Sequence, residues 1–337
     1  MYEKLRRLVL PKMIPPKTKV LAAVSGGPDS VALSHILWRY ARDEQAKELS
    51  LVLTHVHHGV RAESDDEALL VQKLAAEWDV PCIVHYFDAK GYAGAQKQSF
   101  QEAARAWRYA RWKEDMLREG CGLLATAHHL GDQAETILHR LLRGSGTAGL
   151  AGIYPAKGAV IRPLLAFDKN DILQYCAREK LRYTVDSSNL EPVYLRNRIR
   201  LELLPEIEKD YNPRIRESLG RTGEVLRWDE EYLAAQTETA WNKHVRNVDG
   251  ETGLSRDIFS EPAAILSRLL RKAAALASDE PRGLGFRYIQ KIMVSEGKTG
   301  WKQDLPGLTV KITREGVRFF RPDPSTEKPR RRGRKPQ

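Results

Sequence analysis

Residues 18–30 place the strongest constraint on what this chain can fold into. An apolar run there is broken by Ser25-Gly-Gly-Pro-Asp, and from Ser30 onward apolar residues recur with helical spacing. The pattern predicts a buried strand, a tight turn and a helix. Such a turn can hold an anion, because Gly26 and Gly27 let a ligand approach the backbone and the new helix directs its free N–H groups at the same point.

This loop differs from the two best-known phosphate-binding loops. It lacks the Gly-Lys-Ser/Thr ending of a Walker A loop and the G-x-G-x-x-G of a dinucleotide fingerprint. On residue types alone it predicts a phosphate cradle, and the alternative is an ordinary Gly-Pro turn that binds nothing.

Strands and helices alternate along the first half of the chain. The apolar patterns predict strands at 20–24, 49–55, 81–87, 123–127 and 160–165, and helices at 30–43, 63–78, 99–119, 132–142 and 168–180. The strands are continuously apolar, which predicts an α/β fold with a Rossmann-like parallel sheet covered by helices on both faces. Ligands of such sheets bind beyond the carboxyl ends of the strands, where the Ser25 loop and His128-His129 lie.

The character of the chain changes after the polar Asp186-Ser-Ser-Asn loop. Helical patterns cover 214–247 and 261–277, and alternating apolar residues around 308–320 indicate a β-hairpin. We therefore predict a catalytic domain at 1–213, a smaller, mainly helical domain with a terminal hairpin at 214–321, and a basic, disordered tail at 322–337.

Composition narrows the class of partner and the compartment. The net charge of +11 favours a polyanion, most naturally nucleic acid, over a merely basic surface. No apolar run is long enough for a membrane span, and the N-terminus lacks the apolar core of a signal peptide. Three scattered cysteines, without a C-x-x-C pair, suit a reducing cytosol. We expect a cytoplasmic protein with no membrane partner.

The second strong signal is Thr126-Ala-His-His-Leu-Gly-Asp-Gln-Ala-Glu-Thr, which runs from a strand end into a helix. Asp132 and Glu135 are three residues apart and share a helix face. Carboxylates there can cap the helix, hold Mg²⁺ or bind a cationic substrate. His128 suits phosphate contact or proton transfer better than metal ligation, because no third ligand stands at zinc-like spacing.

Two arginine clusters are candidates for phosphate contacts. Arg105, Arg108 and Arg111 recur along one predicted helix, where a plain solvated face is the alternative. The segment Arg196-Asn-Arg-Ile-Arg places Arg196, Arg198 and Arg200 close together, which favours nucleic-acid backbone.

The Ser25-Gly-Gly-Pro-Asp-Ser block resembles the signature of the PP-loop ATP pyrophosphatases. Further blocks stand in the order of the tRNA(Ile)-lysidine synthase family, and the chain resembles its short form. These blocks begin at His55 (HVHHGVR), Glu102 (EAAR), Thr126 (TAHHLGDQAET), Arg162 (RPLL), Asp186 (DSSN) and Arg196 (RNRIR). One departure is Gly131-Asp132, where the family usually has two adjacent aspartates.

The resemblance implies that ATP, with Mg²⁺, activates carbon 2 of the wobble cytidine in a CAU-anticodon tRNA(Ile). The ε-amino group of free lysine then displaces AMP to give lysidine. It implies ATP binding by Ser25, Gly26, Gly27, Pro28, Asp29, Ser30 and Arg105. It implies catalytic roles for Asp29, His128, Asp132 and Glu135, and lysine binding by Asp132 and Glu135. It implies tRNA binding by the helical domain at 214–321 and by Arg196, Arg198 and Arg200. It names no certain metal ligand.

Three rival functions are weighed against this one. A PP-loop cytidine thiolase would need paired cysteines, which the spacing of Cys82, Cys121 and Cys176 does not provide. A ligase of the asparagine or GMP synthetase kind would need a glutaminase partner and no basic surface. A catalytically dead RNA-binding module is disfavoured by the intact Ser25–Ser30 loop. The oligomeric state is open, with a homodimer as one alternative.

Overall fold

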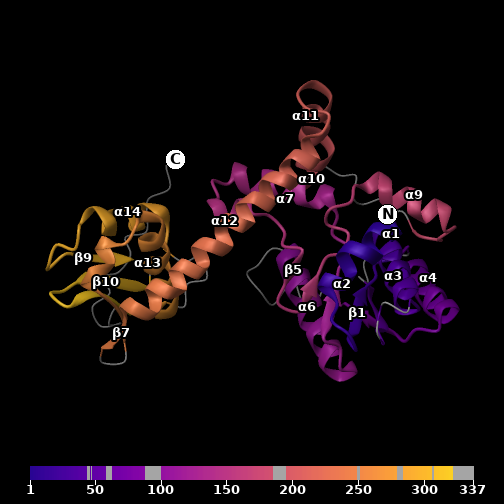
Figure 1. Ribbon diagram of the computed structural model, residues 1–337, viewed down its shortest axis with the longest axis horizontal. Coiled ribbons are helices and arrows are strands. Elements are labelled where there is room, and N and C mark those ends of the chain that lie inside the picture. Colours follow the sequence, from indigo (N-terminus) through magenta and orange to yellow (C-terminus); the bar gives the residue numbers. More distant parts are fainter. Residues whose placement is uncertain are drawn as a thin grey trace, which may run out of the picture. The chain divides into compact units, whose positions relative to one another are not determined.

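The structure, a computed structural model, describes residues 1–43, 46, 48–57, 63–87, 100–184, 195–248, 251–278, 284–305 and 307–321. The chain forms two compact units, Met1–Arg227 and Trp228–Gln337 (Figure 1). The division falls inside helix α12 (Ile215–His244), whereas we predicted a boundary at the beginning of this helix. The Asp186 loop and the basic tail lie outside the described residues.

The first unit is built on a six-stranded sheet with the order β3-β2-β1-β4-β6-β5. All neighbours pair in parallel except the edge strand β5, which confirms the predicted α/β fold with a parallel sheet. The last predicted strand is shorter than expected, because Pro163 has no N–H for a ladder. The strands are β1 (Lys19–Ala23), β2 (Ser50–His57), β3 (Cys82–Tyr86), β4 (Leu123–Ala125), β5 (Ala156–Lys157) and β6 (Val160–Ile161).

Helices cover both faces of this sheet because successive strand side chains point to opposite sides. Val20 and Ala22 of β1 belong to one core cluster, whereas Leu21 belongs to another with Trp112 and Met116 of α6. One face therefore packs against α3, α4, α9 and the N-terminal helices, and the other packs against α6. These helices are α1 (Tyr2–Lys4), α2 (Leu10–Met13), α3 (Pro28–Ala41), α4 (Glu63–Trp78), α6 (Phe100–Glu119) and α9 (Lys169–Arg178).

The strand order reverses at β1. The chain runs outward from β1 through β2 to β3, and then returns to place β4 on the other side of β1. Ligands of open α/β sheets bind at such a reversal, beyond the carboxyl ends of the strands. The loop after β1 is the Ser25 loop, and the segment after β4 carries His128 and leads into α7 (Leu130–Leu142).

A separate apolar cluster attaches the arginine segment to α7. Ala134 and Leu138 of α7 pack against Ile199 and Leu204, which follow one another along a nearly continuous helical stretch. This stretch comprises α10 (Leu195–Arg198), a π-helical turn (Ile199–Leu203) and α11 (Leu204–Asp210). The packing brings the predicted arginine cluster to the helix that carries the predicted carboxylates.

The second unit combines helices with a five-stranded antiparallel sheet, ordered β7-β8-β11-β10-β9. The predicted terminal hairpin is present as β10–β11, and it lies inside a larger sheet that we did not predict. The other strands read Val-Arg-Asn-Val, Glu-Thr-Gly-Leu-Ser and Lys-Gln-Asp-Leu, which lack clear apolar alternation. The elements are β7 (Val245–Val248), β8 (Glu251–Ser255), α13 (Ala263–Ala277), α14 (Phe286–Val294), β9 (Lys302–Leu305), β10 (Leu308–Ile312) and β11 (Gly316–Phe320).

The sheet of the second unit is amphipathic. Leu254, Val310, Val317 and Phe319 are buried with the apolar side of α13 in one core cluster. The other side of the sheet carries mainly polar and charged residues, with Phe320 among them. Among the described residues, no helix is both long and apolar enough to cross a membrane.

Candidate active site

The backbone conformation of the Ser25 loop requires glycine at position 26. Gly26 has a φ of +93°, a region that residues with a side chain rarely adopt. A Cβ atom on Gly26 would lie 3.0 Å from Oγ1 of Thr184. The backbone N–H of Thr184 donates to the Gly26 carbonyl over 2.9 Å, so the loop is held close to a distant segment of the chain.

Hydroxyl groups hold the loop in shape. Oγ of Ser30 accepts a hydrogen bond from the Ser25 backbone N–H at 3.1 Å and donates to the Gly27 carbonyl at 3.0 Å. Gly27 is the N-cap of α3 and supplies no side chain to the first helical N–H groups, and Pro28 occupies the first turn. This leaves a helix N-terminus without a side-chain cap beside a glycine turn, an arrangement that suits a phosphate group.

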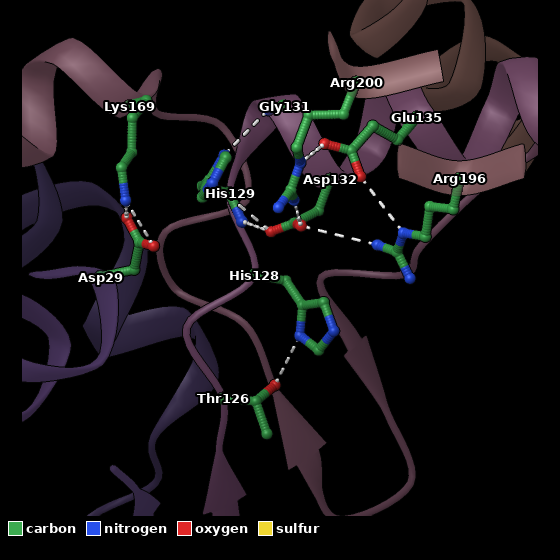
Figure 2. A network of polar contacts seen from close by, with 10 residues as sticks. All are labelled: Asp29, Thr126, His128, His129, Gly131, Asp132, Glu135, Lys169, Arg196 and Arg200. Atoms are coloured by element: carbon green, nitrogen blue, oxygen red, sulfur yellow. Dashed lines mark hydrogen bonds and ion pairs between the residues drawn. The ribbon is translucent and has the colours of Figure 1, made fainter. Parts of the chain in front are cut away.

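Asp29 pairs with a residue that the sequence analysis did not single out. Nζ of Lys169 lies 2.7 Å from both carboxylate oxygens of Asp29 (Figure 2). Lys169 is the first residue of α9, directly after the capping residue Asp168. This pairing could not be predicted from the sequence, because the two residues are 140 positions apart and no motif connects them. A lysine in the first turn of a helix is in itself common. The pair places an ammonium group beside the Ser25 loop.

His128 lies after β4 and is largely buried. Its Nδ1 is 3.0 Å from Oγ1 of Thr126. The pKa of His128 is lowered to about 4, mainly by burial; Asp132 opposes the shift, and the positive charges of Arg162, Arg105 and Arg196 add to it. The imidazole is therefore neutral at pH 7 and can accept a proton or a hydrogen bond.

The beginning of α7 is a capping box that depends on Gly131. Nδ1 of His129 accepts from the Gly131 N–H at 3.0 Å, and the Asp132 carboxylate accepts from the His129 N–H at 3.0 Å. A Cβ atom at position 131 would lie 2.7 Å from Cε1 of the His129 ring. A side chain at position 131 would therefore have to displace the histidine ring.

The two predicted lysine-binding carboxylates contact two of the predicted tRNA-binding arginines (Figure 2). Nε of Arg196 is 3.1 Å and Nε of Arg200 is 2.5 Å from the carboxylate of Glu135. Arg200 also donates to Asp132 at 3.2 Å, and Arg196 lies 3.5 Å from the same oxygen. The Glu135 side chain is only 1% exposed, so these ion pairs compensate a buried charge.

This arrangement changes the electrostatics expected from the sequence. Two carboxylates and two guanidinium groups sum to no net charge, so Asp132 and Glu135 share their site with an equal number of positive charges. The pKa of Asp132 is nevertheless lowered: burial opposes this, and it is outweighed by His129, His128 and Arg196. Arg198 points elsewhere, pairing with Glu202 at 3.3 Å with its side chain 62% exposed.

A pocket of about 330 Å³ lies between the strand ends and α6. It joins most of the predicted site to Tyr109 and Trp112, which sequence reasoning missed although they share helical spacing with Arg105. Nε of Arg108 and Nε1 of Trp112 are buried and have no hydrogen-bond partner among the described residues, as expected where a ligand supplies the acceptor. The lining comprises Ala23, Val24, Ser25, Asp29, Ser30, Thr54, Val56, Arg105, Arg108, Tyr109, Trp112, Thr126, Ala127, His128, Asp132 and Arg196.

Within the described part of the chain, no group of three histidine, cysteine, aspartate or glutamate side chains could hold a metal ion. Cys121 and Cys176 are buried, Cys82 is partly buried, and all three are free thiols. Burial raises the pKa of Cys82 and of Cys176 to about 11, so neither is a ready thiolate. These cysteines do not form the cluster ligands that a thiolase would require.

The comparisons with known proteins agree with this site. A family model described as "PP-loop domain" matches residues 1–207. The tRNA(Ile)-lysidine synthase of Clostridium acetobutylicum is 36% identical over 86% of this chain, which spans 63% of that relative's length. That of Symbiobacterium thermophilum is 36% identical over 93% of this chain and 67% of its own length.

A solved structure shows a similar fold at low sequence identity. It is a U34-tRNA thiolase from Methanococcus maripaludis with a [4Fe-4S] cluster, 19% identical, with a TM-score of 0.57 over 67% of this chain and 78% of that one. At this identity the likeness concerns the fold alone. On the family match and the curated relatives, the chain belongs to the PP-loop family and, within it, to the group of tRNA(Ile)-lysidine synthases.

Proposed function

We propose that this chain uses ATP to activate carbon 2 of the wobble cytidine in a CAU-anticodon tRNA(Ile) and joins it to the ε-amino group of lysine. One observation carries the proposal. A single pocket joins the Ser25 loop to a neutral histidine and to a carboxylate cluster at the reversal of the sheet. The chain spans 63% of the length of the Clostridium acetobutylicum relative that bears this enzyme's name.

The Ser25 loop and the N-terminus of α3 are proposed to hold the ATP phosphates, with Arg105 of α6 facing the same pocket. The carboxylate of Asp29 is a hard oxygen donor beside this loop and fits a magnesium ion that takes its other ligands from phosphate and water. Magnesium would there neutralise charge on the phosphates. Among the described side chains, no cage of several carboxylates surrounds this position.

Lysine is proposed to bind at Asp132, because Asp132 and His128 line the pocket and Glu135 does not. Glu135 would act by holding Arg196 and Arg200 in place. The side chain of Arg196 is 49% exposed, so it can move aside for a second cation at low cost. We propose that His128, neutral at pH 7, accepts a proton from the attacking amine as the new C–N bond forms and AMP leaves.

Incubation of the full chain with ATP, radiolabelled lysine and a CAU-anticodon transcript tests the proposal. The expected result is lysine incorporated into the tRNA, with one AMP and one pyrophosphate released for each lysine. A transcript with a different wobble base serves as control. ATP binding without any incorporation of lysine would refute the lysidine assignment. It would favour another PP-loop tRNA modification, such as cytidine thiolation.

Asp132→Asn tests the proposed lysine site against a matched control. Asp132 and Asp171 are both the third residue of a helix with a capping box, so asparagine removes the charge from the same kind of capping contact in both variants. We expect Asp132→Asn to raise KM for lysine at least tenfold while the Kd for ATP stays within about twofold, because one charge–charge contact is removed. Equal losses for lysine and ATP would assign Asp132 to ATP or magnesium instead.

A further inference from the structure

Thr54 of β2 contributes a buried hydroxyl group to the wall of the pocket. Thr54 is 1% exposed, and its Oγ1 donates a hydrogen bond to Oδ2 of Asp115 in α6 at 3.0 Å. A carboxylate only accepts hydrogen bonds, so the single proton of this hydroxyl is committed to Asp115. The oxygen of Thr54 therefore offers lone pairs, and no proton, to a ligand in the pocket.

Two further contacts fix the carboxylate of Asp115 in this orientation. Nε2 of His85 in β3 lies 2.7 Å from the same oxygen, Oδ2, and Arg118 donates to Oδ1 at 3.1 Å. The Asp115 side chain is 1% exposed, so water hardly competes for these contacts. Of these four residues, Thr54 alone is among the described residues that line the pocket. The network therefore reaches a ligand through the Thr54 hydroxyl.

The same wall of the pocket contains a donor without an acceptor. Nε1 of Trp112 is buried and has no hydrogen-bond partner within the described part of the chain. Trp112 and Asp115 are three residues apart on α6, so they share a face of this helix, and Asp115 contacts Thr54. The wall thus offers one acceptor, Thr54, and one donor, Trp112. A buried N–H without an acceptor destabilises the fold, and a ligand that supplies the acceptor explains its presence.

The position of these groups in the pocket suits the base of a nucleotide. Trp112 follows Arg105 by seven residues on α6, or about 10 Å along the helix axis, so the two residues meet different parts of one ligand. Val56 shares a face of β2 with Thr54 and lines the same pocket. The ring of Tyr109 lies 5.1 Å from that of Trp112. Apolar and aromatic side chains of this kind pack against a flat base, whereas Arg105 faces the proposed phosphate site.

We propose that Thr54, oriented by Asp115, selects the 6-amino group of adenine and so makes the site specific for ATP. The amino group of adenine donates and its N1 accepts, which matches the lone pairs of Thr54 and the N–H of Trp112. Guanine and hypoxanthine have an oxygen and an N1–H at these positions, so both contacts are reversed. Asp115 is a positioning residue, because it acts through Thr54. The placement of adenine rests on the proposed binding of the ATP phosphates at the Ser25 loop.

Thr54→Val tests the acceptor, because valine keeps the shape of threonine without its hydroxyl. Thr309→Val is the matched control: Thr309 is also 1% exposed and also donates to an aspartate, Asp304, at 2.8 Å, but it belongs to the second unit. Calorimetry gives Kd for ATP and for purine riboside triphosphate, which lacks the 6-amino group. The wild type and the control should prefer ATP about tenfold, and Thr54→Val should bind the two nucleotides within about twofold of one another. An equal loss of affinity for both nucleotides in Thr54→Val, with the preference retained, would overturn the proposal.

Asp115→Asn tests the direction of the hydrogen bond. With Arg118 donating to the amide oxygen, the amide NH₂ turns toward Thr54 and His85, and the Thr54 hydroxyl is released to donate into the pocket. The affinity for inosine triphosphate relative to ATP should therefore rise about tenfold over the wild type. An unchanged ratio would refute the positioning role of Asp115. Thr54→Ser keeps the hydroxyl and should retain the preference for ATP; loss of the preference in this variant would also contradict the proposal.

The wobble cytidine is the other base with an amino group beside a ring nitrogen. If Thr54→Val raises KM for the CAU-anticodon tRNA but still prefers ATP to purine riboside triphosphate, Thr54 contacts cytidine and the proposal fails. The calorimetry needs neither lysine nor tRNA, so its result is independent of the proposed reaction. If Thr54→Val loses the preference and the wild type incorporates no lysine, the inference stands and the lysidine assignment fails. If the wild type incorporates lysine and Thr54→Val keeps the preference, the lysidine assignment stands and the inference is refuted.

Discussion

Substitution of Gly131 by alanine should destabilise the first unit, although alanine is the better helix former. The new Cβ would lie 2.7 Å from the His129 ring, which caps α7 through the Gly131 N–H. The ring must move, which costs about 0.5–2 kcal/mol for the lost cap and about 1–3 kcal/mol for overpacking. Alanine returns about 0.5–1 kcal/mol of backbone entropy. We expect a net loss of about 2 kcal/mol.

For a unit of this size, this loss should lower the melting temperature by about 4–8 °C. Thermal unfolding followed by circular dichroism measures it, and a double-mutant cycle with His129→Ala identifies the cause. His129→Ala alone should cost about 1 kcal/mol for the cap. Because the clash needs the ring, Gly131→Ala/His129→Ala should be no less stable than His129→Ala alone. Strictly additive losses, or a rise in melting temperature for Gly131→Ala, would refute this reasoning.

Three further predictions concern the charged groups of the site. Glu135→Gln should lower the free energy of unfolding by about 2–3 kcal/mol. This loss is smaller than for breaking a fully buried ion pair, because the two arginine partners are partly exposed and can reach water. Urea unfolding measures it. Lys169→Met should weaken ATP binding about tenfold and leave AMP binding unchanged, if its ammonium group turns from Asp29 to the outer phosphates; calorimetry with both nucleotides measures this. His128 has a pKa lowered by burial to about 4, so unfolding takes up a proton between pH 4 and 6.5 and stability should fall as the pH falls through this window. As the pH is lowered across that range, the melting temperature of His128→Gln should fall less steeply than that of the wild type. Parallel curves would contradict the lowered pKa of His128.

Much of the fold could be predicted from local pattern. The helix at 63–78 has the predicted bounds, and four of the predicted strands lie within two residues of their observed ends. The strands of the second unit were harder to predict, because β7, β8 and β9 contain charged and polar residues on one face and too few apolar residues on the other. Their pairing depends on the hairpin β10–β11 and on the apolar face of α13, which a local window does not include.

The residue sequence by itself determined the strand, glycine turn and helix around Ser25, the alternation that produces a parallel sheet, and the position of Asp132 and Glu135 on one helix face. Only the tertiary structure decided which charges meet. It joined Asp29 to Lys169, and the two carboxylates to arginines more than 60 positions away. Periodicity determines which face of an element is buried, but the partner of a polar group depends on packing and register between segments distant in sequence.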